Sequence, residues 1–370
     1  MLKRAKQLTL GGEEIQLERA LKHSRIEVLN EFIDWEIFRA TLEKRVRKEN
    51  YDKGGRPPYD VIIMLKIIIL QHFNGNLSND KTEEWLNCRL DWILFLRLTL
   101  GEALPDSNTI RNFKEALGSE GMKELFDLLN AQLLDEGIIM KCGTINDGSF
   151  VDVPRRRTTT KDENESLKNG EVPDSLKPIE NPQTDAEKAH NNRVSQIDTD
   201  ATWAKKGEET HFGYKAHPAI DEKSKIVTEI TVTTASTHDV VMFVYLVCLN
   251  AIALGLDAES AFTVFVDSGY TGEKHAELLK EMFPLIQLLV CKKATKNKPL
   301  TDLEKAYNHA ISTRRCRGEH VFGSITNDMG GMRTSCIGLE RNTRDIVGKF
   351  LAYNLKRAVF LRKKKIAAAA

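Results

Sequence analysis

The stretch TINDGSFVDV, residues Thr144–Val153, is where the pattern of the chain changes. Apolar and polar side chains alternate along it, which predicts a strand with one buried face. Before it, residues 1–140 contain short apolar or charged segments that glycine and proline interrupt, a pattern that favours helices. The stretch therefore predicts the start of an α/β region that follows an all-helical N-terminal region.

The segments after this strand alternate between strand-like and helical patterns. Strand-like segments are short apolar or alternating runs, and helical segments are longer, with apolar residues at helical spacing. The order β-β-β-α-β-α-β-α predicts an α/β domain with a mixed sheet flanked by helices. Strands are expected at Phe212–Ile220, Ile226–Thr233, Thr263–Val266 and Leu285–Val290, and helices at Val240–Leu256, at 272–282 and around Glu319.

Two motifs mark expected helix starts in the N-terminal region. Asp60 precedes an apolar run that ends at Phe73, so it is a candidate N-cap. Pro105–Asn108 opens a further helix, which carries Arg111 and Lys114. We expect residues 1–140 to form one helical domain.

Two charged segments complete the expected domain organisation. Residues 158–200 are rich in charged residues, asparagine, threonine and proline and poor in aromatics, which predicts a mobile surface insertion in the α/β domain. From Arg333 to Lys365 there are ten basic residues and two acids, on a helical pattern. We therefore expect an α/β domain over 141–330 and a basic helical segment over 331–370.

Composition limits the class of protein. With 370 residues, of which 41% are hydrophobic, the chain can bury a core in two or three domains. The 54 basic residues nearly balance the 53 acids, which argues against a histone-like protein but leaves local basic patches open. Six cysteines without a C-x-x-C pair favour reduced thiols in the cytoplasm over a zinc ribbon or a disulfide framework.

The apolar run Val240–Leu256 could be a transmembrane helix or a buried helix of the core. Its 17 residues lie at the short limit for a span of the bilayer. Asp239 and Asp257 flank it, and no lysine or arginine asymmetry lies beside it. We expect a buried core helix rather than a membrane span.

Three acids are candidates for chemistry. Asp147 lies in the first strand and Asp267 follows the fourth, where ligands bind at the carboxyl ends of strands. Glu319 is placed by Phe322 at the edge of the buried face of an expected helix, with Arg315 one turn before it. Three carboxylates suit two Mg²⁺ ions that activate a water or a 3′-hydroxyl for phosphoryl transfer. Alternatively, the aspartates only end strands, and Glu319 forms a surface ion pair.

These motifs together resemble a known family. In order and spacing they are similar to the bacterial insertion-sequence transposases of the DDE class, closest to the IS-five (insertion sequence five) family. The resemblance covers about Arg56 to Leu361. The matching segments are Arg56–Tyr59, Leu104–Phe113, the surroundings of Asp147, Phe212–His217, Thr233–Asp239, Asp267–Gly272 and Arg315-x-x-x-Glu319.

The resemblance implies a ribonuclease-H-like fold and a catalytic set of Asp147, Asp267 and Glu319 that binds Mg²⁺, with Mn²⁺ as a substitute. It implies a helical N-terminal domain for DNA binding and dimerisation. The implied activity is cutting of the terminal inverted repeats of an insertion sequence and joining of the 3′-hydroxyl ends to target DNA. The expected partners are double-stranded DNA and further copies of the chain, and no membrane.

The sequence departs from the family pattern at two positions. Related transposases often carry lysine or arginine seven residues after the glutamate, and here that residue is Thr326. Ser312 stands where some relatives have tyrosine. Either the helix ends early or Arg333 provides the phosphate contact.

Further residues are candidates for contacts with DNA or for support of the site. His238 is expected to orient a catalytic carboxylate, and Asp239 to cap the core helix or support the site. Trp203 either stacks on a base or anchors the insertion to the sheet. The alternative to DNA contact, for each basic candidate, is a side chain that is simply solvated at the surface. The candidates for DNA contacts are Arg111, Lys114, Lys215, His217, Lys292, Lys293, Arg315, His320 and Arg333, and Lys296 and Lys298 extend the basic loop.

The leading hypothesis is thus a DDE transposase. A second hypothesis is a catalytically impaired, transposase-derived DNA-binding protein or repressor, which Thr326 supports. A third is a general metal-dependent nuclease that ignores terminal repeats, against which the long helical N-terminal region argues.

Overall fold

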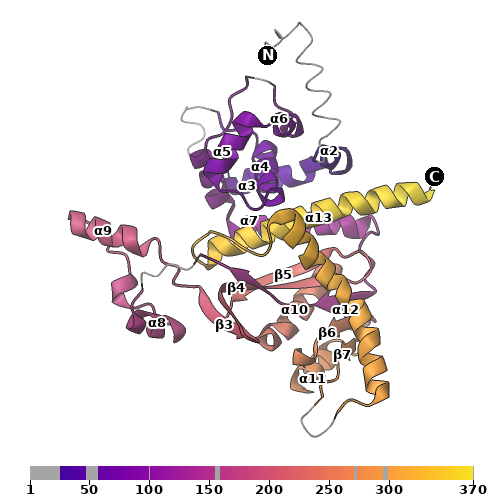
Figure 1. Cartoon of the computed structure of the whole chain (residues 1–370). Helices are drawn as coiled ribbons and strands as arrows, with labels where there is room; N and C mark the ends of the chain where they lie inside the picture. The colour runs from indigo at the N-terminus through magenta and orange to yellow at the C-terminus, as the bar shows by residue number, and fades with distance from the viewer. Residues whose placement is uncertain are drawn as a thin grey trace, which may run out of the picture. The chain divides into compact units, whose positions relative to one another are not determined.

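The computed structural model describes residues 26–46, 57–99, 101–154, 159–270, 273–294 and 299–369 (Figure 1). The chain divides into two compact units. One contains the described residues up to Leu117 together with those from Ala358 onward, and the other is Gly118–Arg357. The boundaries expected near residues 140 and 330 thus both lie inside the second unit.

The first unit is helical, as the sequence predicts. Asp60 caps the apolar helix α4, because its Oδ1 accepts from the amide of Ile62 at 2.8 Å. Asp106 starts α7 in the same way, through the amide of Thr109 at 2.7 Å. Both expected helix starts are confirmed. The elements are α2 (Val28–Phe32), η1 (Trp35–Phe38), α3 (Arg39–Val46), α4 (Val61–Phe73), α5 (Asn79–Cys88), α6 (Leu90–Leu96), the start of α7 (Ser107–Asp135) and the end of α13 (Leu339–Ala369).

A kink divides α7 at the border of the two units. Gly118 has φ 64° and ψ −179°, a left-handed value that interrupts the helix. Ser119 begins the second part, and its amide donates to the Glu340 carboxylate at 2.7 Å. A carboxylate from α13 thus caps the start of this part of α7.

The second unit contains a mixed sheet, which the sequence also predicts. Its central order is β5–β4–β1–β6–β7, in which β1, β6 and β7 are parallel and β4 is antiparallel to β1 and β5. β2 continues β1 along one edge of β4, and β3 continues β5 along the other edge, since Gly213 pairs with both Asp152 of β2 and Thr202 of β3. The strands are β1 (Gly143–Asn146), β2 (Ser149–Asp152), β3 (Thr202–Lys206), β4 (Glu209–Asp221), β5 (Val227–Thr234), β6 (Thr263–Val266) and β7 (Gln287–Val290).

Helices cover both faces of this sheet. α10 (Asp239–Leu254) and α11 (Glu273–Met282) pack on one face, where Phe243, Val264 and Leu279 belong to one buried cluster. α12 (Asp302–Met329) crosses the other face, where a Cβ on Gly318 would lie 3.2 Å from Ile145. These two faces are called the α10 face and the α12 face below.

α10 is only partly buried, which corrects the expectation of a core helix. Phe243 and Val247 face the sheet, but Val241, Tyr245 and Ile252 are 53–75% exposed. Within the described part of the chain, no helix is both long enough and apolar enough to cross a bilayer.

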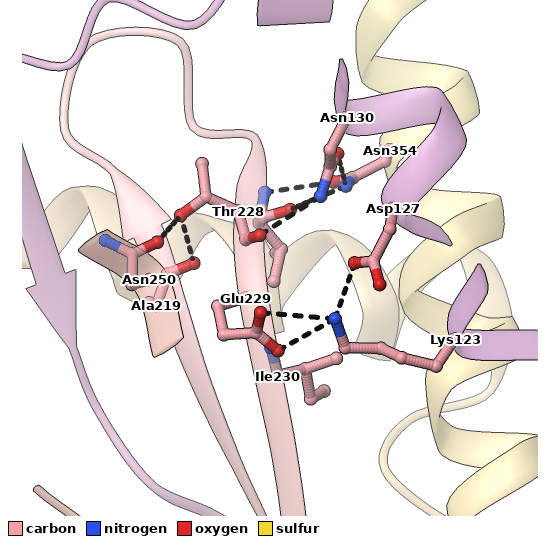
Figure 2. A network of polar contacts seen from close by, with 10 residues as sticks. Lys123, Asp127, Asn130, Ala219, Thr228, Glu229, Ile230, Asn250 and Asn354 are labelled. Atoms are coloured by element: carbon pink, nitrogen blue, oxygen red, sulfur yellow. Dashed lines mark hydrogen bonds and ion pairs between the residues drawn. The ribbon is translucent and has the colours of Figure 1, made fainter. Parts of the chain in front are cut away.

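A network of buried polar side chains connects β5 to the helices around it (Figure 2). Asn354 of α13 donates to the carbonyl of Val227 at 2.7 Å and accepts from its amide at 3.0 Å. Asn130 of α7 donates to the same carbonyl at 3.0 Å. On the α10 face, Asn250 accepts from Thr228 and donates to Thr144 of β1 at 3.1 Å. Because buried polar groups require partners, these contacts fix the register of the helices on the sheet.

The segment between β2 and β3 contains more structure than its composition predicts. It forms α8 (Lys161–Lys168), η3 (Asp174–Leu176) and α9 (Asp185–Val194). Thr160 with Glu163 and Thr184 with Glu187 form capping boxes at the two helices. Leu176 is buried despite the polar surroundings in sequence. The capping pattern T-x-x-E was the signal that could have revealed both helices.

Candidate active site

Two of the three candidate acids leave neighbouring parallel strands side by side. Ile145 of β1 pairs with Phe265 of β6, so Asp147 and Asp267 follow the pair by two residues each. Side chains alternate between faces, and Ile145 faces Gly318 on the α12 face, so Asp147 is directed to that face. Asp267 follows the same alternation, because Val264 and Val266 belong to the cluster on the α10 face. Both carboxylates therefore lie at one edge and on one face of the sheet.

Arg315 of α12 brings a positive charge to this pair. Its Nη1 lies 3.3 Å from Oδ1 of Asp267. Burial raises the pKa of Asp147 above its ordinary value, the charge of Asp267 raises it further, and Arg315 and Lys206 oppose this effect. The amide of Gly148 also donates to Oδ1 of Asp147, at 3.0 Å. The two acids thus interact with each other and share one cation.

Glu319 lies on the side of α12 that faces these strand ends. Arg317 and His320 point to the β4–β5 turn, where Arg317 donates to the carbonyl of Glu222 at 2.9 Å and His320 contacts Lys225. Glu222 in turn bonds to Gly143, at the start of β1. Arg315 points the opposite way, and Glu319 follows it by one helical turn on the same side.

The structure thus brings Asp147 and Asp267 together, and it places Glu319 on the adjacent turn without a contact to either. Among the residues described, no three carboxylate, imidazole or thiol side chains lie close enough to hold a metal ion together. Convergence of all three acids around a metal stays a prediction. The donor set fits a hard divalent cation, because two carboxylates that raise each other's cost of ionisation need additional positive charge.

Lys215 and His217 are buried on the opposite face and point at Asp239. The side chain of Lys215 lies 3.3 Å from Oδ1 of Asp239, and Nδ1 of His217 lies 3.4 Å from the same atom. Lys215 is 7% exposed and His217 1%. Burial lowers the pKa of His217 to about 4, an effect that Asp239 opposes. The two side chains face Asp239 instead of solvent, and their contact with DNA stays a prediction.

The start of α10 also differs from the expectation. His238, not Asp239, is its N-cap, and His238 makes no capping hydrogen bond through its side chain. Asp239 is the first helical residue, and its carboxylate faces Lys215. An orienting role of His238 stays a prediction.

The remaining basic candidates lie at the surface or beside other elements. Lys292 and Lys293 are exposed after β7, and Asn308 of α12 bonds to the backbone of Lys292. Arg333 is exposed and pairs through its backbone with Asp152 of β2. In the first unit, Arg111 is exposed on α7, and Lys114 lies 3.4 Å from Asn79. DNA contact by each of these residues stays a prediction, as does one by His320, and Lys296 and Lys298 lie outside the described residues.

Trp203 and the hairpin that carries it were incompletely predicted. Trp203 is 40% exposed and packs on Phe212, with ring centres 5.0 Å apart. It lines a cavity of about 440 Å³ together with Leu167 and Asn164 of the insertion. This placement agrees with an anchor between the insertion and the sheet. The β3–β4 pairing itself was missed, because a short polar strand gives no periodic signal.

α12 continues past the position where the family pattern has a basic residue. The helix ends at Met329, and Gly330 terminates it in the left-handed conformation. Thr326 is therefore helical, exposed and two turns from Glu319 on the same side. The expectation that the helix ends before Thr326 is wrong.

Comparison with known protein families places the chain among the transposases. Residues 139–355 match the family described as transposase DDE domain. The chain belongs to the transposase DDE domain family. This transposase domain contains all three candidate acids, and residues 15–116 match a second family described as a transposase domain. The strands in the order β5–β4–β1–β6–β7 form the mixed sheet, flanked by helices, that the sequence predicts. Neither match distinguishes the IS-five family from other insertion-sequence families.

Two solved transposase structures are similar at low identity. The piggyBac transposase synaptic complex with hairpin DNA is 10% identical, with a TM-score of 0.40, and the match covers 94% of this chain and 78% of that one. The Mos1 transposase paired-end complex with left transposon end is 11% identical, with a TM-score of 0.21, over 76% of this chain and 83% of that one.

Proposed function

We propose that this transposase cuts the terminal inverted repeats of an insertion sequence and joins the 3′-hydroxyl ends to target DNA. The observation that supports it best is the pair Asp147 and Asp267, which end adjacent parallel strands on the face that α12 crosses. Glu319 completes the set from α12. The IS-five family is the insertion-sequence family that the motifs favour.

Each residue of the proposed site has a distinct part in this chemistry. Asp147, Asp267 and Glu319 would hold two Mg²⁺ ions, or Mn²⁺ in their place. Such ions activate a water or a 3′-hydroxyl and stabilise the leaving oxygen of an in-line phosphoryl transfer. Arg315 balances the charge of Asp267 from 3.3 Å, and its planar guanidinium is suited to hold a neighbouring phosphate of the DNA.

DNA binding in this proposal depends on basic surfaces rather than on net charge. The N-terminal helix with Arg111 and Lys114 is the proposed reader of the repeats. Lys292, Lys293 and Arg333 lie exposed around the catalytic unit and would contact phosphates. Such contacts make binding strongly dependent on salt concentration. Two copies of the chain would act on paired ends.

The test uses DNA that flanks the reading frame. End-labelled fragments with its inverted repeats are incubated with the purified protein and Mg²⁺. We expect specific nicking at the ends by the wild type and none by Asp267→Ala or Asp147→Asn. Equal cleavage by the wild type and either variant would refute the assigned site.

A second function is favoured by Thr326. The helix presents this uncharged residue two turns after Glu319, where a basic residue would hold DNA. A catalytically impaired DNA-binding protein or repressor would bind the ends specifically and not nick them with Mg²⁺ or Mn²⁺. Specific binding of repeat-end DNA without nicking would favour this alternative over the transposase.

A further inference from the structure

A polar cluster lies behind the loop that carries Asp147, on the α10 face of the sheet. It consists of the buried side chains of Lys215 and His217 and of Asp239, whose side chain is 38% exposed. Lys215 donates to the carbonyl of Thr237 at 2.9 Å, and its Nζ lies 3.3 Å from Oδ1 of Asp239. His217 approaches the same oxygen to 3.4 Å and bonds to Thr233 at 2.9 Å through its other ring nitrogen. Because a buried ammonium group needs a partner, these contacts hold the Asp239 carboxylate in one place.

The same carboxylate oxygen lies against the loop that carries Asp147. A Cβ on Gly148 would lie 2.6 Å from Oδ1 of Asp239 and 3.1 Å from its Cγ. No Cβ atom fits at that distance, so only glycine allows the approach. Gly148 is not among the residues with positive φ, so space rather than backbone conformation requires the glycine. Asp239 therefore packs against the backbone of the residue that follows Asp147.

This contact involves the short backbone segment that sets the direction of the Asp147 side chain. Asp147 and Gly148 are the two residues between β1 and β2, outside the ladders of both strands. Their backbone is therefore held less by sheet hydrogen bonds than that of their neighbours. The Asp239 carboxylate prevents the Gly148 backbone from moving toward the α10 face. The Asp147 side chain is therefore directed to the α12 face.

We propose that Asp239, held by Lys215 and His217, is a positioning residue that fixes the Gly148 backbone and thereby the direction of the Asp147 carboxylate. The inference rests on the proposed function, since the direction of Asp147 matters only if this acid serves the reaction. It assigns to the segment Ser236–Asp239 a role that capping of α10 does not explain, because the cap residue is His238.

Two substitutions test the contact from its two sides. Gly148→Ala introduces the methyl group that collides with Asp239, and Asp239→Asn removes the charge that Lys215 holds. The matched control is Gly323→Ala in α12, where a Cβ has no neighbour within 4 Å. Each variant is compared with the wild type in strand cleavage of repeat-end DNA, in Mn²⁺ binding by electron paramagnetic resonance, and in hydrogen exchange of residues 143–152 without metal.

A positioning role predicts a specific pattern of effects. Both variants should lower kcat about 100-fold, as a displacement of about 1 Å in a catalytic group does. Mn²⁺ affinity should fall about tenfold, as it does when a group that orients a metal ligand is lost. The KM for DNA should stay within about twofold, because Lys215 and His217 face Asp239 rather than solvent, and Asp239 therefore presents no charge to the DNA. Exchange of residues 143–152 should accelerate in both variants, and Gly323→Ala should behave as the wild type.

A double variant separates the contact from a general loss of stability. If Gly148→Ala acts through the collision, adding it to Asp239→Ser should reduce kcat by much less than it does in the wild type, because the carboxylate is gone. Should Asp239→Asn fail to fold, Gly148→Ala alone carries the test. Folded Gly148→Ala with wild-type kcat and Mn²⁺ affinity, while Asp147→Asn is inactive, would overturn the positioning role alone. An active Asp147→Asn would overturn the proposed site and this inference with it.

Discussion

The ion pair between Lys123 of α7 and Glu229 of β5 offers a sharp test of the packing around the sheet (Figure 2). Glu229 is 3% exposed, and Lys123 lies 3.1 Å from its carboxylate. Burial raises the pKa of Glu229 above its ordinary value of 4.5, and the charge of Lys123 opposes this shift. Lys123→Met removes the cation and leaves the buried carboxylate with the amide of Ile230 as its main partner.

The expected loss of stability follows from the burial of the two side chains. Removing one partner of a fully buried pair costs about 3–5 kcal/mol. The side chain of Lys123 is 30% exposed, so water screens the pair in part, and we expect about 2–3 kcal/mol. For a unit of this size, that corresponds to a decrease in Tm of about 5–10 °C.

The loss should depend on pH in a defined direction. The pKa of Glu229 is higher in the folded than in the unfolded state, so its protonated form favours folding, and this contribution is lost as pH rises through the folded pKa. Lys123→Met raises the folded pKa further. The destabilisation should therefore be greatest near neutral pH and should shrink as pH falls toward 4.5.

Calorimetry at pH 7.5 and pH 5 measures both effects. Lys123→Met with Glu229→Gln removes both charges and should recover part of the lost Tm. Lys188→Met is the control, because its pair with Asp185 spans 3.6 Å between exposed side chains. An unchanged Tm of Lys123→Met at pH 7.5, or an equal decrease at both pH values, would refute the reasoning.

Three further predictions concern α12 and the α10 face of the sheet. Thr326→Lys should tighten binding to repeat-end DNA and make the salt dependence steeper by about one charge, as measured by fluorescence anisotropy at several salt concentrations. If the slope of the binding constant against salt concentration does not change, the DNA does not pass residue 326. Gly318→Val should separate α12 from Ile145, which a Cβ would approach to 3.2 Å, and should lower Tm and abolish cleavage, whereas Gly323→Ala should do neither. NMR should show no titration of His217 between pH 5.5 and 8, because burial lowers its pKa to about 4, and a midpoint near 6.5 would contradict its burial.

Local sequence patterns predicted the elements of the sheet well, because each depends on its own residues. The run Thr263–Val266 forms β6 with the same bounds, and Asp60 caps α4 as expected. Apart from the missed β3, the first strand is an exception, since alternation across TINDGSFVDV predicted one strand and the structure has β1 and β2 with Asp147 and Gly148 between them. Gly148, at this break, packs against Asp239, a residue about ninety positions later, which no window on the strand can include.

The difference between local patterns and contacts with distant residues also explains which site residues could be predicted. Asp147 and Asp267 follow apolar runs, so their place at strand ends is a local property, and parallel pairing of β1 with β6 brings them together. The partners of Lys215 and His217 are not local. Lys215 and His217 alternate with Tyr214 and Ala216, so both lie on one face of β4, but only the packing of α10 on that face decides that it is buried.

Glu319 shows how a helix residue acquires a functional direction from contacts on its other sides. Gly318 lets α12 approach β1, and Arg317 bonds to the carbonyl of Glu222 at 2.9 Å, which fixes the rotation of the helix about its axis. With that rotation fixed, Arg315 can reach only the strand ends, where it pairs with Asp267. Glu319, one turn further, is then directed to the same end of the sheet. The direction of this acid thus follows from a glycine and an arginine that take no part in the proposed chemistry, so the proposed site depends on packing contacts as well as on its carboxylates.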